Sequence, residues 1–224
     1  MLRLYDYAAS ANCYKVRLLL AQLGRDYERV SVDIFPGDTL TDQYAAINPA
    51  RSTPVLEVDG EYLAESNAIL VFLAEGTEFT PDGSLDRARV IGLLIFEQTE
   101  VMATMGGLRF RLLTKRLSPQ GVEARSRGER AIRTLPLLDG HLGRRDFLVG
   151  DRYSIADTAM FGYTHVADEA GLDLSRYPAV LRWLDRVRSQ SGHVNDLEPC
   201  PENARREVDA RSMTRAGGQG PSSA

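Results

Sequence analysis

The 224-residue sequence predicts an α/β domain followed by an all-helical domain. Three observations lead to this prediction. Strand-like and helix-like patterns alternate over residues 1–80, no strand-like pattern follows residue 84, and the turn-rich stretch 80–84 separates the two regions. Because 43% of the residues are hydrophobic, the chain can bury one large core or two smaller ones.

The first region opens as strand, helix, strand. Residues 2–6 alternate between apolar and polar side chains. Residues 16–23 place apolar side chains at i, i+3, i+4 and i+7, which form one face of a helix, and Gly24 ends that helix. Residues 28–33 alternate again, so the three segments predict a βαβ unit.

A hairpin and a further helix complete the first region. After a short predicted helix near residues 40–46, the strand-like runs 55–58 and 61–64 flank Asp59-Gly60. Asp-Gly between two such runs predicts a β-hairpin, because both turn positions tolerate positive φ. A helix then begins near Ser66, so the predicted order is βαβ, a second helix, then ββα.

The second region is typical of an α-helical bundle, which we expect over residues 85–198. The polar stretch 199–224 predicts a disordered tail, because it buries too little apolar surface to offset its ordering entropy. Gly106-Gly107 indicates a local break within the first helical pattern. The helical patterns cover residues 85–115, 120–142, 154–170 and 177–190.

Composition argues against several classes of partner. The formal net charge of −4 provides no broad positive field for nucleic acid or an anionic membrane surface. The N-terminus lacks the features of a secretion signal, and no apolar run approaches the roughly 18 residues of a membrane span, so we expect a cytoplasmic protein. With two cysteines and three histidines, neither a disulfide framework nor a metal site is expected.

Three loop segments carry the candidate chemistry, and each also has a purely structural explanation. Ser10 and Asn12 lie where the first strand meets the first helix, a place that favours an anion, and either residue can instead simply cap that helix. Thr53-Pro54 precedes a buried strand. Either the strand begins there, or the peptide bond is cis and turns the Thr53 backbone outward. Glu65-Ser66 forms another strand-to-helix junction, again a possible cap.

A βαβ–ββα sheet would bring these three loops to one edge, and the combined pattern resembles the cytosolic glutathione transferase family, most closely its bacterial theta-like and nu-like branches. The motifs occur in the family's order over about residues 1–190. The resemblance implies a thioredoxin-like α/β N-terminal domain, residues 1–80, and an all-α C-terminal helical bundle domain. The matching motifs are Ser10-x-Asn12-x-x-Lys15-Val16, Asn48-Pro49, Thr53-Pro54-Val55-Leu56, Asp59-Gly60, Leu63-Ala64-Glu65-Ser66-Asn67-Ala68-Ile69, and Ser154-Ile155-Ala156-Asp157, the last as a helix-capping box.

The resemblance also implies roles for individual residues. Ser10 matches the family's catalytic serine, which holds the glutathione thiolate, and Asn12 the polar residue that assists it. Thr53, before a cis Pro54, would pair through its backbone with the cysteinyl part of glutathione. Two further contacts follow from the same motifs: Glu65 and Ser66 would bind the γ-glutamyl amino and carboxylate groups. Many members carry Gly and then Lys, Arg or Gln before the residue–proline pair, whereas this chain has Arg51-Ser52, so Arg51 is the candidate for the glycyl carboxylate.

The implied function is transfer of glutathione to a small, largely apolar electrophile by a homodimer, with glutathione as co-substrate and no metal. Tyr7 is discounted as a catalytic tyrosine, because the family places that residue nearer Asp6. Cys13 is expected to be a buried small hydrophobe. Residues 96–110, with Met102, Met105 and Leu108, are expected either to line the second-substrate pocket or to belong to the core. The alternatives are a noncatalytic ligand-binding or interaction protein of this fold, and a glutathione-dependent disulfide or peroxide reductase.

Overall fold

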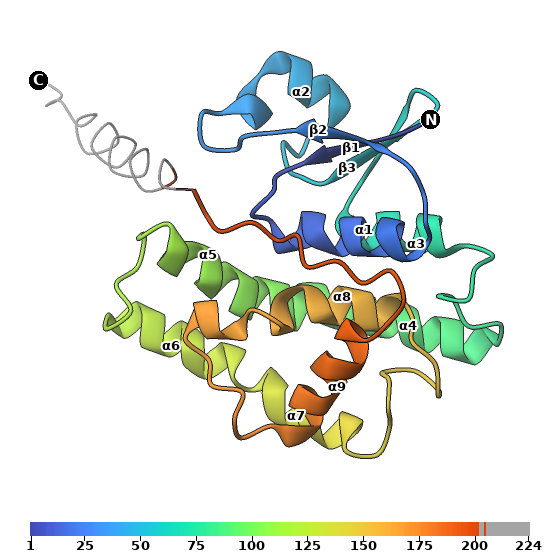
Figure 1. Cartoon of the computed structure of the whole chain (residues 1–224). Helices are drawn as coiled ribbons and strands as arrows, with labels where there is room; N and C mark the ends of the chain where they lie inside the picture. Colours follow the sequence, from blue (N-terminus) through green and yellow to red (C-terminus); the bar gives the residue numbers. More distant parts are fainter. Residues whose placement is uncertain (202–203, 205–224) are drawn as a thin grey trace, which may run out of the picture.

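The computed structural model describes residues 1–201 and residue 204, with a small sheet domain stacked on a larger helical domain (Figure 1). The sheet has four strands in the order β2-β1-β3-β4. β1 (Leu2–Asp6) runs parallel to β2 (Glu28–Ser31) and antiparallel to β3 (Val55–Val58), which pairs with β4 (Glu61–Ala64). The predicted thioredoxin-like topology is therefore confirmed.

The two layers of helix around the sheet differ in their burial. α1 (Ala11–Gln22) and α3 (Ser66–Ala74) lie between the sheet and the helical domain, whereas η1 (Asp38–Leu40) and α2 (Asp42–Ile47) lie on the opposite side of the sheet (Figure 1). α1 is buried over most of its surface because it contacts the sheet on one side and the helical domain on the other.

The hairpin forms as predicted. Val58 pairs with Glu61 across the turn Asp59-Gly60, whose φ angles of 52° and 91° are both positive. The Thr53-Pro54 peptide bond is cis, one of the two arrangements that the sequence allowed.

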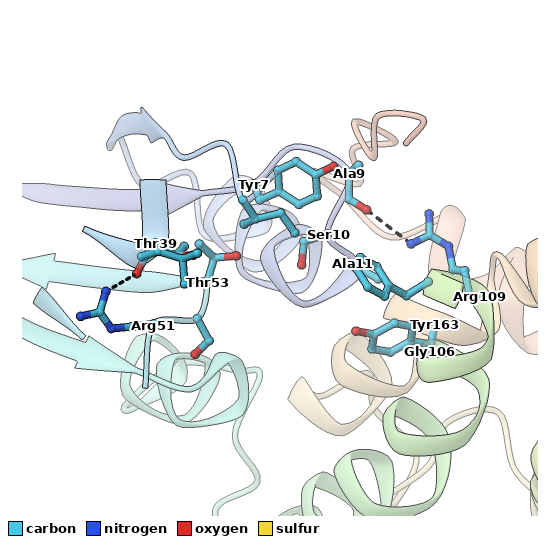
Figure 2. A pocket seen from close by; sticks show the side chains of 14 residues that line it. Tyr7, Ala9, Ser10, Ala11, Thr39, Arg51, Thr53, Gly106, Arg109 and Tyr163 are labelled. Atoms are coloured by element: carbon cyan, nitrogen blue, oxygen red, sulfur yellow. Dashed lines mark hydrogen bonds between the residues drawn. The ribbon is translucent and has the colours of Figure 1, made fainter. Parts of the chain in front are cut away.

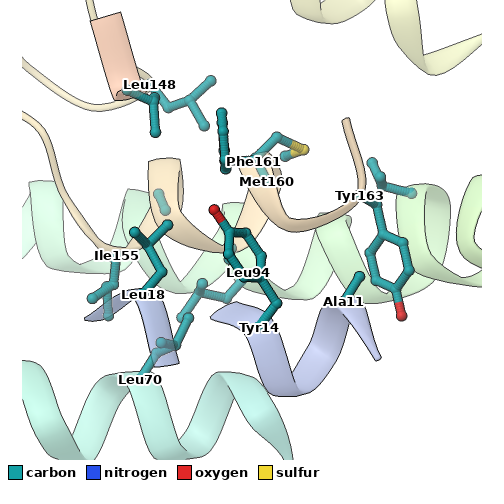
Figure 3. Packing of buried hydrophobic residues seen from close by; sticks show 14 of the residues in the cluster. Ala11, Tyr14, Leu18, Leu70, Leu94, Leu148, Ile155, Met160, Phe161 and Tyr163 are labelled. Carbon is teal, nitrogen blue, oxygen red and sulfur yellow. The ribbon is translucent and has the colours of Figure 1, made fainter. Parts of the chain in front are cut away.

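The helical domain is built around α8 (Ile155–Thr164), all ten residues of which are buried. Figure 3 shows Tyr14 and Leu18 of α1 beside Ile155, Met160 and Phe161 of α8, so one apolar core continues across both domains. The other elements are α4 (Ser84–Phe96), a π-helical segment η2 (Glu97–Gly106), α5 (Gly107–Leu113), α6 (Val122–Ala131), α7 (Thr134–Leu142), η3 (Ala167–Ala170) and α9 (Pro178–Arg188). Within residues 1–201 and 204, no helix is long and apolar enough to cross a membrane.

Gly106 and Gly107 do not break the helix, contrary to the sequence-based prediction. The backbone continues through them with helical φ and ψ, and only its hydrogen bonding changes, from π to α. Gly106 has a different role: a Cβ atom there would lie 2.5 Å from the ring of Tyr163. The glycine therefore allows α8 and this helix to approach closely.

The chain after α9 returns to the sheet domain as an extended segment, residues 189–201, that lies along α1 (Figure 1). Tyr14 donates its hydroxyl hydrogen to the Val194 carbonyl (2.8 Å), and the buried guanidinium of Arg17 contacts both Asp6 and Asp196. The predicted disordered tail falls mostly on residues 202–203 and 205–224, which lie outside the described residues.

Candidate active site

A cavity of about 390 Å³ opens between the loops of the sheet domain and the helices of the second domain (Figure 2). Its volume falls within the range of about 300–1,000 Å³ usual for small-molecule sites. The sheet domain contributes the loop after β1, the loop after β2 and the loop before β3. The helical domain contributes Gly106, Arg109 and Phe110 from one helix and Tyr163 from α8.

Ser10 caps α1 and also lines this cavity, so its two possible roles coexist. Its Oγ accepts a hydrogen bond from the backbone N–H of Cys13 at 3.3 Å. A hydroxyl group that accepts in this way still has its own hydrogen to donate. The side chain therefore lies at a helix N-terminus, where backbone dipoles favour a negative charge, with one donor of its own.

Arg51 and Thr53 line the same cavity as Ser10. The guanidinium of Arg51 is fixed to the loop between β2 and α2: its Nη1 donates to the carbonyl oxygens of Thr39 and Thr41, and its Nη2 lies 3.6 Å from Asp42. Pro54, which follows Thr53, is buried.

Asn12, Ser66 and Glu65 form a second group beside the cavity rather than in its lining. The Ser66 hydroxyl donates to Asn12 Oδ1 at 3.3 Å, which joins the start of α3 to the first turn of α1. Ser66 is buried, whereas Glu65 is exposed and has a φ of 71°. Two of the predicted loops thus meet through a direct side-chain contact.

Cys13 is completely buried, as predicted for a small hydrophobe. Burial raises the pKa of its thiol to about 11, although the hydroxyls of Thr53 and Ser10 oppose this rise. The protonated thiol therefore dominates at neutral pH, and Cys13 is a poor nucleophile.

Tyr7, which the sequence led us to discount, lines the cavity. Burial raises the pKa of its hydroxyl, and the nearby Cys200 and Asp33 raise it further. At neutral pH the phenol is therefore a hydrogen-bond donor rather than a phenolate. Its ring packs edge-on against Phe35.

The segment 96–110 contributes to the cavity, which is one of its two expected roles, but through residues other than the methionines and leucine named from the sequence. Met105 and Leu108 belong to the core, while Gly106, Arg109 and Phe110, one position away, line the cavity. The spacing of apolar residues along this helix identified the side chains that are buried in the core. No motif indicated that Arg109, or Tyr163 on α8, would line the cavity.

A larger hollow of about 670 Å³ lies where the two domains are connected, but none of the predicted site residues lines it. Among residues 1–201 and 204, no group of three or more His, Cys, Asp or Glu side chains is placed to hold a metal ion.

Comparison with known proteins agrees with this architecture. The family model described as "Glutathione S-transferase, N-terminal domain" matches residues 4–78, and "Glutathione S-transferase, C-terminal domain" matches residues 111–191. The chain belongs to the glutathione S-transferase family. Similar glutathione S-transferase structures include one from Pseudomonas fluorescens Pf-5, which is 42% identical with a TM-score of 0.85 and covers 88% of this chain and 99% of that one.

Curated relatives of this glutathione S-transferase family member carry several activities in their names. Disulfide-bond oxidoreductase YfcG of Escherichia coli K12 is 30% identical over 85% of this chain and 91% of its own. Maleylacetoacetate isomerase of Rhizobium meliloti is 31% identical over 82% of this chain and 89% of its own. A zeta-class glutathione S-transferase of Euphorbia esula is 30% identical over 88% and 90%. The family is thus established, while the relatives span more than one of its branches.

One feature of this family member ties both glutathione S-transferase domains together beneath the cavity. Lys15 of α1 donates to Glu97 of the helical domain at 3.0 Å and to Asn67 of α3 at 3.2 Å, and Asn67 also donates to Glu97 at 2.9 Å. Lys15 and Glu97 are completely buried. This network fixes the starts of α1 and α3, next to Ser10 and Ser66, relative to the second domain.

Proposed function

We propose that the protein is a glutathione transferase that ionises the thiol of glutathione and directs the thiolate at an electrophile held by the helical domain. One observation carries the proposal: Ser10, at the N-terminus of α1, shares a cavity with Thr53 and Arg51, and helical-domain side chains form the facing wall. The Ser10 hydroxyl, which we propose as the donor to the glutathione sulfur, therefore lies next to the space proposed for the second substrate.

In this proposal each part of glutathione has a partner in the cavity or beside it. The Thr53 backbone pairs with the cysteinyl unit, and this places the sulfur at the Ser10 hydroxyl. Arg51 binds the glycyl carboxylate. Ser66 and Glu65 bind the γ-glutamyl carboxylate and amino group, and Asn12, already in contact with Ser66, supports Ser10. Charge-assisted hydrogen bonds and a helix N-terminus are the interactions that carboxylates and thiolates favour.

The interactions at this site are strong enough to lower the pKa of the glutathione thiol to near neutral. A free thiol, with a pKa of about 8.5, is only a few per cent ionised at neutral pH. A charge-assisted hydrogen bond from Ser10 contributes roughly 1.5–3 kcal/mol and the helix N-terminus roughly 0.3–1 kcal/mol. At about 1.4 kcal/mol per pKa unit, and after the cost of lost hydration is subtracted, these interactions lower the thiol pKa by about one to two units, which makes the thiolate a major species.

A second candidate is reduction of disulfides or peroxides by the same glutathione thiolate. The similarity to the Escherichia coli protein named a disulfide-bond oxidoreductase favours this second candidate. Cys13 is buried and protonated, so this candidate does not use its thiol, and we assign the reacting sulfur to glutathione here too. We place the chain in the bacterial theta-like or nu-like branch, as a cytoplasmic homodimer.

The test has two stages. Calorimetry at millimolar glutathione should give binding heat, and glutathione should raise the thermal unfolding temperature. A panel of aromatic electrophiles, disulfides and hydroperoxides then assigns the reaction. No heat and no thermal stabilisation by glutathione would refute the proposed function, and turnover confined to disulfides or hydroperoxides would favour the second candidate.

A further inference from the structure

Arg109 is a buried cation at the wall of the cavity that uses only part of its hydrogen-bonding capacity. The residue is 6% exposed. Its Nε donates to Glu169, and its Nη1 donates to the Ala9 carbonyl at 3.3 Å. A guanidinium has five N–H groups, and these two hydrogen bonds use two of them. Because Arg109 lines the cavity, a further N–H can donate to a ligand there, and such a bond to an anionic group is stronger than one between neutral groups.

The Tyr7 hydroxyl is a second, independent donor at the same place. Tyr7 is 9% exposed, and its hydroxyl makes no hydrogen bond of normal geometry with the part of the chain that the structure describes. The thiol of Cys200 lies near enough to serve as a hydrogen-bond partner of this hydroxyl and to raise its pKa, but a thiol is only a weak acceptor, which a carboxylate can replace. Arg109 also lies close enough to act electrostatically on this phenol, and Figure 2 shows the two side chains on either side of Ala9.

The charge of the cavity favours an anion. Among the described residues, its lining includes two arginines, Arg51 and Arg109, and no acidic residue. Two acids act on the two donors: Glu169 occupies the Nε edge of Arg109, and Asp33, which also accepts the backbone N–H of Phe35, acts electrostatically on Tyr7. If Arg51 binds the glycyl carboxylate of glutathione, the part of the Arg109 guanidinium that does not face Glu169 is left for a different anion.

The rest of this wall carries aromatic rings, and the guanidinium of Arg116 lies 4.9 Å from the centroid of the Phe110 ring. Phe110 stacks on Phe35 with ring centroids 6.2 Å apart and an interplanar angle of 8°. The Tyr163 ring packs closely against Gly106, and both residues line the neighbouring side of the cavity. A planar or aromatic group can lie against these rings while a polar group reaches the two donors.

On the basis of the proposed function, we infer that the second substrate is an electrophile with a flat apolar body and a carboxylate or similar anionic group, bound by the Arg109 guanidinium and the Tyr7 hydroxyl. This substrate class differs from the largely apolar electrophile that the sequence led us to expect. Glutathione occupies the Ser10, Thr53 and Arg51 side of the cavity, and the anion of the electrophile occupies the opposite end.

The test compares two glutathione conjugates that differ in one charged group. S-benzylglutathione and S-(4-carboxybenzyl)glutathione are titrated by calorimetry into the wild-type protein and into Arg109→Met, Arg109→Lys, Tyr7→Phe and Glu169→Gln. In the wild type, the carboxybenzyl conjugate should bind about tenfold more tightly or better. Arg109→Met should weaken it by about ten- to a hundredfold while the affinities for the benzyl conjugate and for glutathione change less than about twofold.

The other variants separate charge from general disruption. Arg109→Lys should keep part of the preference because it keeps the charge, and Tyr7→Phe should reduce it by about threefold to tenfold. Glu169→Gln retains Arg109, removes a competing carboxylate and should strengthen carboxybenzyl binding. This variant and Tyr7→Phe carry the test if Arg109→Met does not fold.

The outcomes distinguish this inference from the proposed function. Equal affinity for the two conjugates in the wild type, or an equal loss for both in Arg109→Met, would overturn the anionic substrate class while glutathione binding persists. Loss of glutathione binding itself in Arg109→Met would assign the arginine to glutathione and would also overturn it. Absence of binding by glutathione and both conjugates would refute the proposed function and the inference together.

Discussion

Ser10 caps a helix and lines the cavity with the same side chain. Its oxygen accepts the Cys13 N–H and thereby caps α1, while its hydrogen is available to a ligand in the cavity. Both roles follow from the strand-to-helix junction, so a sequence motif alone could not separate them. Because the backbone N–H groups at the start of α1 remain when the hydroxyl is removed, substitution can isolate the hydroxyl's share.

Ser10→Ala should leave glutathione bound but raise the thiol pKa in the complex by about one to two units. Turnover near neutral pH should then fall by roughly ten- to a hundredfold where thiolate formation limits the rate. Thiolate absorbance as a function of pH, with conjugation rates over the same range, measures both effects. Ser10→Thr, which keeps a hydroxyl, is the matched control, and adding Asn12→Ala should deepen the loss. An unchanged thiol pKa in Ser10→Ala would remove Ser10 from the proposed mechanism.

Residues at junctions could be predicted, and residues that meet across the domains could not. Ser10 and Thr53 lie beside predicted strands or helices, so their positions followed from local pattern. Arg109 and Tyr163 reach the cavity only because two helices cross at Gly106, and that close approach depends on tertiary packing. The expectation that Gly106-Gly107 breaks the helix was wrong for a related reason. The sequence shows that these residues lack side chains, but it does not show that the Tyr163 ring packs against Gly106.

The capping box of α8 rests on one buried carboxylate. Asp157 accepts hydrogen bonds from the backbone N–H groups of Leu148 and Ser154, from the Ser154 hydroxyl and from the Trp183 indole. Burial nevertheless raises its pKa to about 6. The Asp157 carboxylate therefore joins three parts of the domain: the start of α8, the loop before it, and α9.

The sign of its pH dependence follows from proton binding. Because the folded state binds this proton more tightly than the unfolded state does, the Asp157 contribution to the free energy of unfolding falls as pH rises from about 4 to about 6, by up to about 3 kcal/mol. Asp157→Asn should abolish this part of the slope and, by losing the bonds from Ser154, destabilise the protein by about 1–3 kcal/mol at pH 7. Urea unfolding at several pH values measures both.

Ser154→Ala is the control for that experiment. It removes the hydroxyl cap at a cost of about 1 kcal/mol but should keep the slope between pH 4 and 6. A slope that is the same in Asp157→Asn as in the wild type would mean that other carboxylates cause it.

The buried Lys15–Glu97 pair joins α1 to the helical domain and should be sensitive to loss of either partner. Burial lowers the pKa of Lys15, and Glu97 opposes this effect. Glu97→Gln leaves the ammonium without a counter-charge, and Lys15→Met leaves the carboxylate with neutral partners only, so each should cost about 3–5 kcal/mol. The double variant Lys15→Met/Glu97→Gln should cost clearly less than the sum of the two.

Denaturant unfolding of the four proteins in a double-mutant cycle measures this coupling. Glu123→Gln provides the control, since Glu123 pairs with Arg127 on the exposed surface of α6 and should contribute less than about 1 kcal/mol. Additive losses in the cycle would contradict a direct ion pair between the domains.

At the scale of the whole molecule, the order of elements could be predicted and their contacts could not. The βαβ–ββα pattern and the helical second half followed from periodicity, because each element buries one face or stripe. The extended segment after α9 carries no period. Its placement depends on ion pairs such as Arg17–Asp196, which join residues 179 positions apart and leave no local signal in the sequence.

The surface of the molecule retains apolar side chains on three consecutive elements. Tyr62 of β4, Phe72 of α3, and Ile91 and Ile95 of α4 are all exposed. Such exposure on neighbouring segments is typical of an interface, and a twofold homodimer buries the same surface on both subunits. The expected homodimer therefore has a candidate interface on β4, α3 and α4.

Phe72→Asp should convert the homodimer to a monomer, because the interface would bury one unpaired carboxylate on each subunit, and a charge without a partner is expensive to desolvate. In sedimentation velocity, the wild type should behave as a particle of twice the chain mass, and the variant as a single chain of 24.8 kDa. Val122→Asp, at an exposed valine on α6, outside these three elements, is the matched control and should remain dimeric. A wild-type protein that sediments as a single chain would contradict the dimer itself. Equal dissociation by Phe72→Asp and Val122→Asp would instead place the interface elsewhere.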